Sequence, residues 1–99
     1  MNLLQTVADT LIQEGIVRNY SEFSRTFCGK TTNYYYRQRH FGRDFSLDGL
    51  IHTAIQLRRA NRHYNQYVVF ESEQAVLNTL EKLIKEELLT KYRIKELVM

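Results

Sequence analysis

The amino-acid sequence predicts an all-α fold of four to five helices that ends in a long C-terminal helix. The chain has 99 residues, no proline and only four glycines. Proline and glycine interrupt helices, so their scarcity favours a helical chain. Apolar side chains also recur every three or four residues along most of the sequence, a spacing typical of helices that bury one face. At this length we expect a single domain, residues 1–99.

The first helix is expected from about Asn2 to Glu14. Leu4, Val7 and Leu11 recur on one of its faces. The glycine at position 15 stands where a helix end favours a left-handed residue. The spacing therefore predicts an amphipathic helix with a defined stop.

A second, short helix is expected from about Tyr20 to Phe27. Asn19 followed three residues later by Glu22 is typical of a capping box at a helix N-terminus. Phe23 and Phe27 lie four residues apart and would share a buried face. Gly29 then breaks the helix.

A third helix is expected to begin at Thr31 or Thr32, either of which can accept a bond from the first free N–H groups. It would end at Gly42. This helix contains three consecutive tyrosines, residues 34–36. Neighbouring residues on a helix point about 100° apart, so the three tyrosines cannot all be buried. At least one of them must face solvent or a partner.

The rest of the chain predicts two further helices. Ser46 can cap a helix from Leu47 to about Arg62, and Ser72 can cap the last helix, from Glu73 to about Leu97. Between them, residues 64–70 have the composition of a short strand or an extended connector. The last helix is longer than the core of residues 1–63 can cover. Part of the apolar stripe of residues 72–97 is therefore expected to contact a second copy of the chain, so that the protein forms a homodimer.

Positive charge is concentrated in the middle of the chain. The net charge of the whole chain is +3, whereas residues 16–68 hold nine basic and three acidic side chains, a net charge of +6. Eight of these nine cations are arginines, and a guanidinium can donate two parallel hydrogen bonds to a phosphate or a base edge. The segment favours an anionic partner such as nucleic acid. A solvated basic surface would have the same composition.

Residues 23–31, FSRTFCGKT, resemble the turn region of small bacterial and phage helix-turn-helix repressors. The resemblance covers about residues 19–43. Ser24 would be the small residue that lets the two helices approach, but it lies five residues before Gly29, where the repressors have four. The turn would then be one residue longer, or another residue would make the helix contact. The resemblance implies a helix-turn-helix core in a small bacterial or phage DNA-binding regulator of transcription.

One face of the third helix carries the residue types that bind nucleic acid. Residues 33, 36, 37 and 40 share this face if Tyr35 and Gln38 point inward. Asparagine can bond to adenine and arginine to guanine, while hydroxyls and cations contact phosphates. Exposed tyrosines would also stack on unpaired bases, so single-stranded DNA or RNA remains open beside double-stranded DNA. The predicted nucleic-acid contacts are Lys30, Thr31, Thr32, Asn33, Tyr36, Arg37, Arg39, His40 and Arg43.

Catalysis and metal binding have little support in the sequence. Cys28 is the only cysteine, and no histidine is spaced from it as in a metal-ligand motif. A core thiol is the simpler interpretation of Cys28. There is no glycine-rich phosphate loop and no nucleophile elbow. Asp44 and Asp48 are expected to complement the dipole of the fourth helix. We therefore expect no enzyme activity, no metal and no cofactor.

The sequence leaves one alternative function and one expectation about location. The N-terminus lacks the pattern of a signal peptide, and no apolar stretch is long enough to span a bilayer, so a cytoplasmic protein without membrane contact is expected. Tyrosine and arginine are also enriched at protein interfaces. The same face would therefore suit a protein-interaction adaptor or an assembly subunit.

Overall fold

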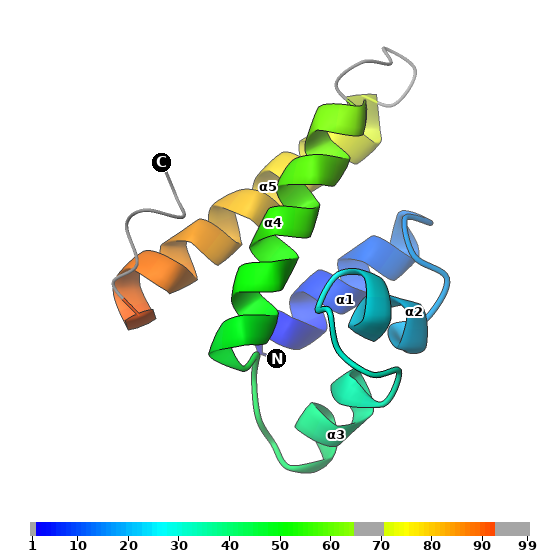
Figure 1. Cartoon of the computed structure of the whole chain (residues 1–99). Coiled ribbons are helices and arrows are strands. Elements are labelled where there is room, and N and C mark those ends of the chain that lie inside the picture. Colours follow the sequence, from blue (N-terminus) through cyan, green and yellow to red (C-terminus); the bar gives the residue numbers. More distant parts are fainter. Residues whose placement is uncertain (1, 65–70, 93–99) are drawn as a thin grey trace. The chain divides into compact units, whose positions relative to one another are not determined.

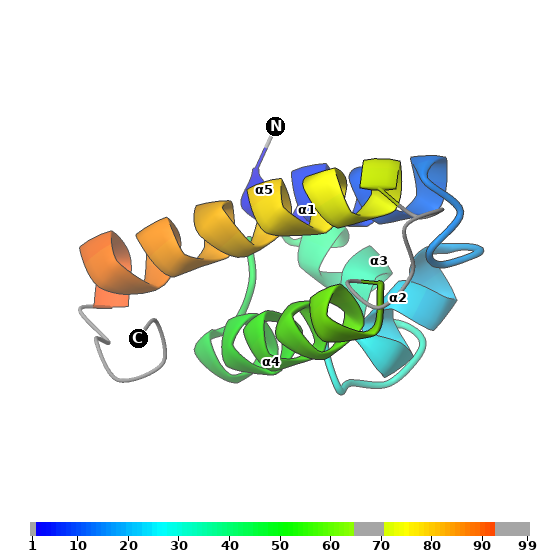
Figure 2. The same ribbon diagram turned by 90° about the horizontal axis from the view of Figure 1, so that it is seen from above.

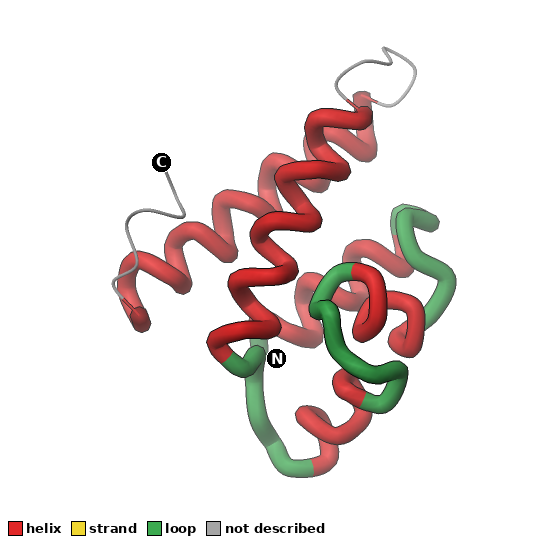
Figure 3. The backbone as a smooth tube through the Cα atoms, in the orientation of Figure 1, coloured by secondary structure: helices red, strands yellow, loops and turns green. Residues whose placement is uncertain are grey.

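The fold is all-α, as predicted. The computed structural model describes residues 2–64 and 71–92, and within these ranges every regular element is a helix (Figures 1 and 3). The helices are α1 (Leu3–Gln13), α2 (Tyr20–Thr26), α3 (Tyr34–His40), α4 (Leu47–Tyr64) and α5 (Glu71–Glu87), and α5 continues as a π-helical segment, Leu88–Tyr92. None of the described helices has the length and apolar composition needed to cross a bilayer.

The chain divides into two compact units, Met1–Thr53 and Ala54–Met99. The boundary falls inside α4. Figure 2 shows the five helices from a second direction. The residues predicted to bind nucleic acid all belong to the first unit.

The first two helices begin where the sequence predicts. The side chain of Asn2 accepts a hydrogen bond from the backbone N–H of Gln5 at 2.9 Å, and Asn19 accepts one from Glu22 at the same distance. The predicted capping box is only half formed. The carboxylate of Glu22 accepts from the backbone N–H of Arg18 at 3.0 Å and from the Arg18 side chain at 2.9 Å.

The third helix begins at Tyr34, so the predicted start at Thr31 or Thr32 is wrong. Residues 27–33 form a longer loop, because Gly29 takes a left-handed backbone, φ +65°, and the N–H of Lys30 returns to the carbonyl of Ser24 at 3.0 Å. A Cβ at Gly29 would lie 2.6 Å from the ring of His52. The loop thus requires glycine for its conformation and for the space beside it.

The last two helices are extended relative to the prediction. α4 runs to Tyr64, two residues beyond Arg62, and α5 begins at Glu71, ahead of the predicted cap at Ser72. The strand expected over residues 64–70 falls, apart from Tyr64, outside the described residues. The part of the last helix expected beyond Tyr92 also lies outside them.

Ser24 is fully buried where α2 meets α3. Its hydroxyl donates to the carbonyl of Tyr20 at 2.8 Å and accepts from the backbone N–H of Tyr35 at 3.0 Å. The backbone carbonyl of Ser24 also accepts from the N–H of Lys30, which closes the loop between α2 and α3. One small side chain therefore satisfies a buried donor of the next helix and permits close packing, which is the position that the sequence suggested for it.

Asp44 caps α1 and not α4, so the expectation for this residue is wrong. Its carboxylate accepts from the backbone N–H groups of Leu3 at 3.1 Å and Leu4 at 2.8 Å. A second bond joins the same two segments, because the side-chain amide of Asn2 donates to the carbonyl of Arg43 at 3.1 Å. A carboxylate at a helix N-terminus complements the helix dipole. The loop between α3 and α4 is therefore fixed to the start of α1.

In the second unit, α5 buries one stripe of aliphatic side chains. Leu77, Leu80, Ile84 and Leu88 are at most 2% exposed, whereas Leu89 is 40% exposed. The side-chain amide of Asn61 in α4 donates to the side-chain oxygen of Asn78 in α5 at 2.5 Å. Most of the apolar stripe predicted from the sequence is thus buried within the chain.

Replacing Ser24 by alanine is expected to lower the free energy of unfolding by about 1–3 kcal/mol, because the N–H of Tyr35 would stay buried without an acceptor. Urea unfolding followed by circular dichroism measures the change. Thr26→Ala is the matched control, since the Thr26 hydroxyl bonds to the carbonyl of Glu22 at 2.7 Å on the exposed side of α2. Equal losses in the two variants would contradict the role assigned to Ser24.

Candidate nucleic-acid interface

The three consecutive tyrosines of α3 divide between core and surface. Tyr34 is 9% exposed and Tyr35 is 4% exposed, whereas Tyr36 is 51% exposed. The prediction that at least one of them faces solvent is confirmed. The two buried rings fix which side of α3 turns outward.

The ring of Tyr35 is held by Tyr20 of α2. The two rings are stacked, with centroids 4.0 Å apart and planes 3° from parallel. The hydroxyl of Tyr20 donates to a carboxylate oxygen of Asp9 in α1 at 2.5 Å. This hydrogen bond and partial burial raise the pKa of Tyr20 well above its ordinary value. The phenol therefore stays protonated and joins α1, α2 and α3.

The outward side of α3 is polar and cationic. Asn33, Tyr36, Arg37 and His40 are all exposed, as the spacing predicted. Gln38 is half-buried, and its amide donates to the carbonyl of Asp44 at 2.5 Å. Gln38 thus faces the loop before α4 and leaves the outer side to the predicted residues.

Arg39 and Arg43 are the two other predicted arginines, and each has a contact within the first unit. Arg39 is exposed and donates to the side-chain oxygen of Gln5 in α1 at 2.6 Å. Arg43 is exposed, and its guanidinium carbon lies 5.1 Å from the centroid of the Phe41 ring. Neither arginine forms an ion pair in the part of the chain that the structure describes.

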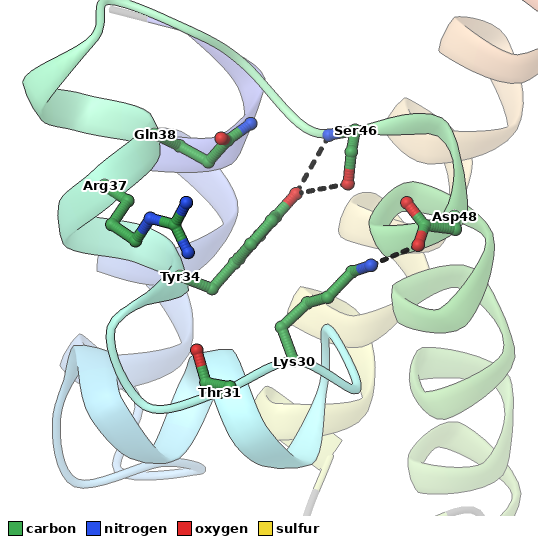
Figure 4. A pocket seen from close by; sticks show the side chains of 7 residues that line it. All are labelled: Lys30, Thr31, Tyr34, Arg37, Gln38, Ser46 and Asp48. Atoms are coloured by element: carbon green, nitrogen blue, oxygen red, sulfur yellow. Dashed lines mark hydrogen bonds and ion pairs between the residues drawn. The ribbon is translucent and has the colours of Figure 1, made fainter.

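A pocket of about 330 Å³ opens beside α3 (Figure 4). The hydroxyl of Tyr34 forms its inner wall and bonds to the backbone N–H and the hydroxyl of Ser46, each at 2.9 Å. The guanidinium of Arg37 points into the pocket and has no hydrogen-bond or ion-pair partner among the described residues. The residues that line the pocket are Lys30, Thr31, Tyr34, Arg37, Gln38, Ser46 and Asp48.

Lys30 and Asp48 form an ion pair across this pocket. The ammonium of Lys30 is the main cause that lowers the pKa of Asp48 to about 2, and a bond from Ser46 adds to the effect. The pKa of Lys30 is raised by the same contact. Arg37 is therefore the one cation of the pocket lining whose charge is not paired within the described residues.

All nine predicted contact residues lie within residues 30–43 of the first unit. Eight are exposed, and Lys30 is half-buried. The structure differs from the prediction in their setting. Thr31 and Thr32 belong to the loop before α3 and not to its first turn, and Asn33 precedes the helix without a side-chain cap bond.

Phe41 was not singled out by the sequence. Its side chain is 59% exposed next to the predicted cations. Spacing alone would have placed it inside, because it lies seven residues after the buried Tyr34. The one signal for its exposure was its position beside Gly42, where the helix stops.

Cys28 is a core thiol, as interpreted from the sequence. It is 1% exposed, and its burial raises the pKa of the thiol to about 12. Among the described residues, no group of three histidine, cysteine, aspartate or glutamate side chains is arranged to hold a metal ion. The described part of the chain thus offers neither a reactive thiolate nor a metal cluster beside the cationic surface.

The model of a family described as a family of unknown function (DUF6626) matches residues 4–97, nearly the whole chain. No curated protein and no solved structure matches.

The carboxyl of Asp48 is expected to stay ionised down to about pH 2, whereas an unpaired aspartate titrates near pH 3.9. The stability contributed by the ion pair is therefore present above about pH 4 and is lost as the pH falls toward 2. Titration of the carboxyl carbon by NMR measures this pKa. Lys30→Met should raise it, and Arg37→Met, in the same pocket, should not. A pKa unchanged by Lys30→Met would contradict the assigned cause.

Proposed function

Because the chain belongs to the DUF6626 family, whose function is unknown, we propose a function from its own residues. The protein binds nucleic acid, with double-stranded DNA as the ligand, through the outward side of α3 and the adjoining loops. It acts as a small helix-turn-helix regulator of transcription. The observation that carries this proposal is the uncompensated positive charge of that surface.

The charge of residues 23–43 has no carboxylate of its own segment to balance it. The segment contains five arginines and lysines and neither aspartate nor glutamate. Of the flanking carboxylates, Glu22 is bonded to Arg18 and Asp44 to the start of α1, whereas Asp48 pairs with Lys30 of the segment. The uncompensated charge is therefore that of the four arginines, which form no ion pair among the described residues. A surface of this kind favours a polyanion, and phosphate contacts of arginine supply most of the affinity in protein–DNA complexes.

Base contacts would come from Asn33, Arg37 and His40. An exposed asparagine can bond to adenine and an arginine to guanine in the major groove. Burial of Tyr34 and Tyr35 holds these groups outward, so little ordering is needed on binding. α3 has seven residues, about 10 Å of helix, so few base pairs would be contacted directly.

As a regulator the protein would act as a homodimer through α5. Leu89 is 40% exposed on this helix, and Val76 and Leu83 are only partly buried. A second copy would cover them. Two α3 surfaces would then contact half-sites about 34 Å apart, one turn of DNA.

The alternative is a protein-interaction adaptor. It is favoured by the exposure of Tyr36 and Phe41 beside arginines, a combination enriched at protein interfaces. Salt dependence separates the two functions, because binding to DNA through several phosphates weakens steeply with added salt.

The double variant Asn33→Ala/Arg37→Ala is expected to weaken binding to duplex DNA by about 2–5 kcal/mol, because it removes two base contacts. Fluorescence anisotropy with mixed-sequence duplexes at several salt concentrations measures both affinity and salt slope. Because the double variant removes base contacts, the slope of log K against log salt should change by less than about 1, the change expected for the loss of one phosphate contact.

Arg18→Ala is the matched control for this experiment. It removes one charge from the same unit, but Arg18 is already paired with Glu22 at 2.9 Å. It should change affinity by less than the double variant. If the parent protein fails to bind any duplex at low salt, the proposed function is wrong and the adaptor is favoured.

Leu89→Lys is expected to shift the protein from dimer to monomer in sedimentation-velocity experiments, because it places a charge in the proposed interface. Ile55→Lys is the matched control, since Ile55 of α4 is equally exposed, at 40%. A parent protein that sediments as a monomer at high micromolar concentration would contradict the dimer.

A further inference from the structure

Phe41 is the most exposed large apolar side chain in the described part of the chain, at 59%. Water contact with a phenylalanine ring is unfavourable, and burial of such a ring is among the larger single contributions to binding. Single exposed apolar side chains are common on protein surfaces, so the backbone and the neighbours of Phe41 decide whether it is a contact site.

The backbone beneath Phe41 is held firmly. Phe41 is the C-cap residue that follows α3, and Gly42 comes next with a left-handed backbone, φ +65°. The N–H of Gly42 donates to the carbonyl of Arg39 at 3.1 Å, and the N–H of Arg43 donates to the carbonyl of Gln38 at 2.7 Å. This pair of bonds is a Schellman motif, which requires glycine at the left-handed position. The helix stop thus directs Phe41 away from the core.

The next residues tie this corner to α1. The carbonyl of Arg43 accepts from Asn2, and the carboxylate of Asp44 accepts from the N–H groups of Leu3 and Leu4. Hydrogen bonds therefore hold the backbone on both sides of Phe41. Presenting its ring to a ligand costs little conformational entropy.

The surroundings of the ring select an anionic ligand. The guanidinium of Arg43 lies 5.1 Å from the ring centroid, and the His40 ring packs edge-on with centroids 4.9 Å apart. Arg39, two residues before Phe41, is exposed and donates to the side-chain oxygen of Gln5 in α1 at 2.6 Å. An aromatic ring with one guanidinium over it and a second arginine two residues away offers the groups that contact a nucleobase and its flanking phosphates.

We propose that Phe41 is a stacking wedge, which packs against a nucleobase at an unpaired or unstacked position of DNA while Arg39 and Arg43 hold the flanking phosphates. This inference rests on the proposed nucleic-acid function and specifies the site and the form of DNA preferred. Apolar side chains inserted at base steps are a known means of binding deformed duplexes. A mismatch or bulge removes the cost of unstacking and should be preferred.

Two DNA probes test the wedge: a short duplex with all bases paired, and the same duplex with one extra unpaired base. The parent protein should bind the second probe more tightly by roughly 5- to 150-fold, the range of aromatic–base stacking. Phe41→Ala should remove this preference and leave binding to the paired duplex nearly unchanged. Ile55→Ala, the control at an exposed apolar residue of α4, should retain it.

Phe41→Trp adds a direct signal, because the chain contains no other tryptophan. Its fluorescence should be quenched by the duplex with the unpaired base more than by the paired duplex. Equal affinity of the parent for both probes, or a preference that survives in Phe41→Ala, overturns the wedge while the proposed function stands. If the parent binds neither probe, both proposals fail.

Discussion

The hydroxyl of Ser24 is the contact on which the cationic surface depends. It accepts the N–H of Tyr35 while it donates within α2, so it joins two helices through a group small enough to be fully buried. The ring of Tyr35 then stacks on Tyr20, whose hydroxyl continues to Asp9 of α1. The orientation of α3 follows from this connection, and with it the exposure of the arginines. A buried polar network of this kind specifies one arrangement only when each member has a partner.

Much of the first unit was predictable because its signals are local. Asparagine caps, glycines at left-handed positions and apolar spacing act over a few residues, and they placed α1, α2 and the beginning of α4 correctly. The start of α3 was not predictable from the threonines, because the loop before it is set by contacts from elsewhere. His52 lies against Gly29, and the carbonyl of Ser24 binds the N–H of Lys30. Capping propensity is a weak signal beside such tertiary contacts.

The sequence predicted which residues form the candidate site, but it did not predict all of their contacts. The spacing of residues 33, 36, 37 and 40 gave the outward face, since Tyr35 and Gln38 do turn away from it. The ion pair of Lys30 with Asp48 was not predictable, because it joins residues 18 apart in the sequence. Its consequence is that Arg37, and not Lys30, carries the unpaired charge in the pocket. Phe41 was missed because its spacing from Tyr34 is that of a buried residue, whereas α3 ends at His40 and leaves the ring exposed.

The cap on α1 has a consequence for how the chain folds during synthesis. The first helix leaves the ribosome before its cap does, because the carboxylate that binds its opening N–H groups belongs to a residue 40 positions later. Until Asp44 has emerged, that helix lacks one of its end contacts, and isolated helices of its length are marginal in water. The nascent chain therefore gains a stable α1 only when the segment through α3 and the following loop is available. The proposed binding surface and the N-terminal helix should mature together, as one cooperative event.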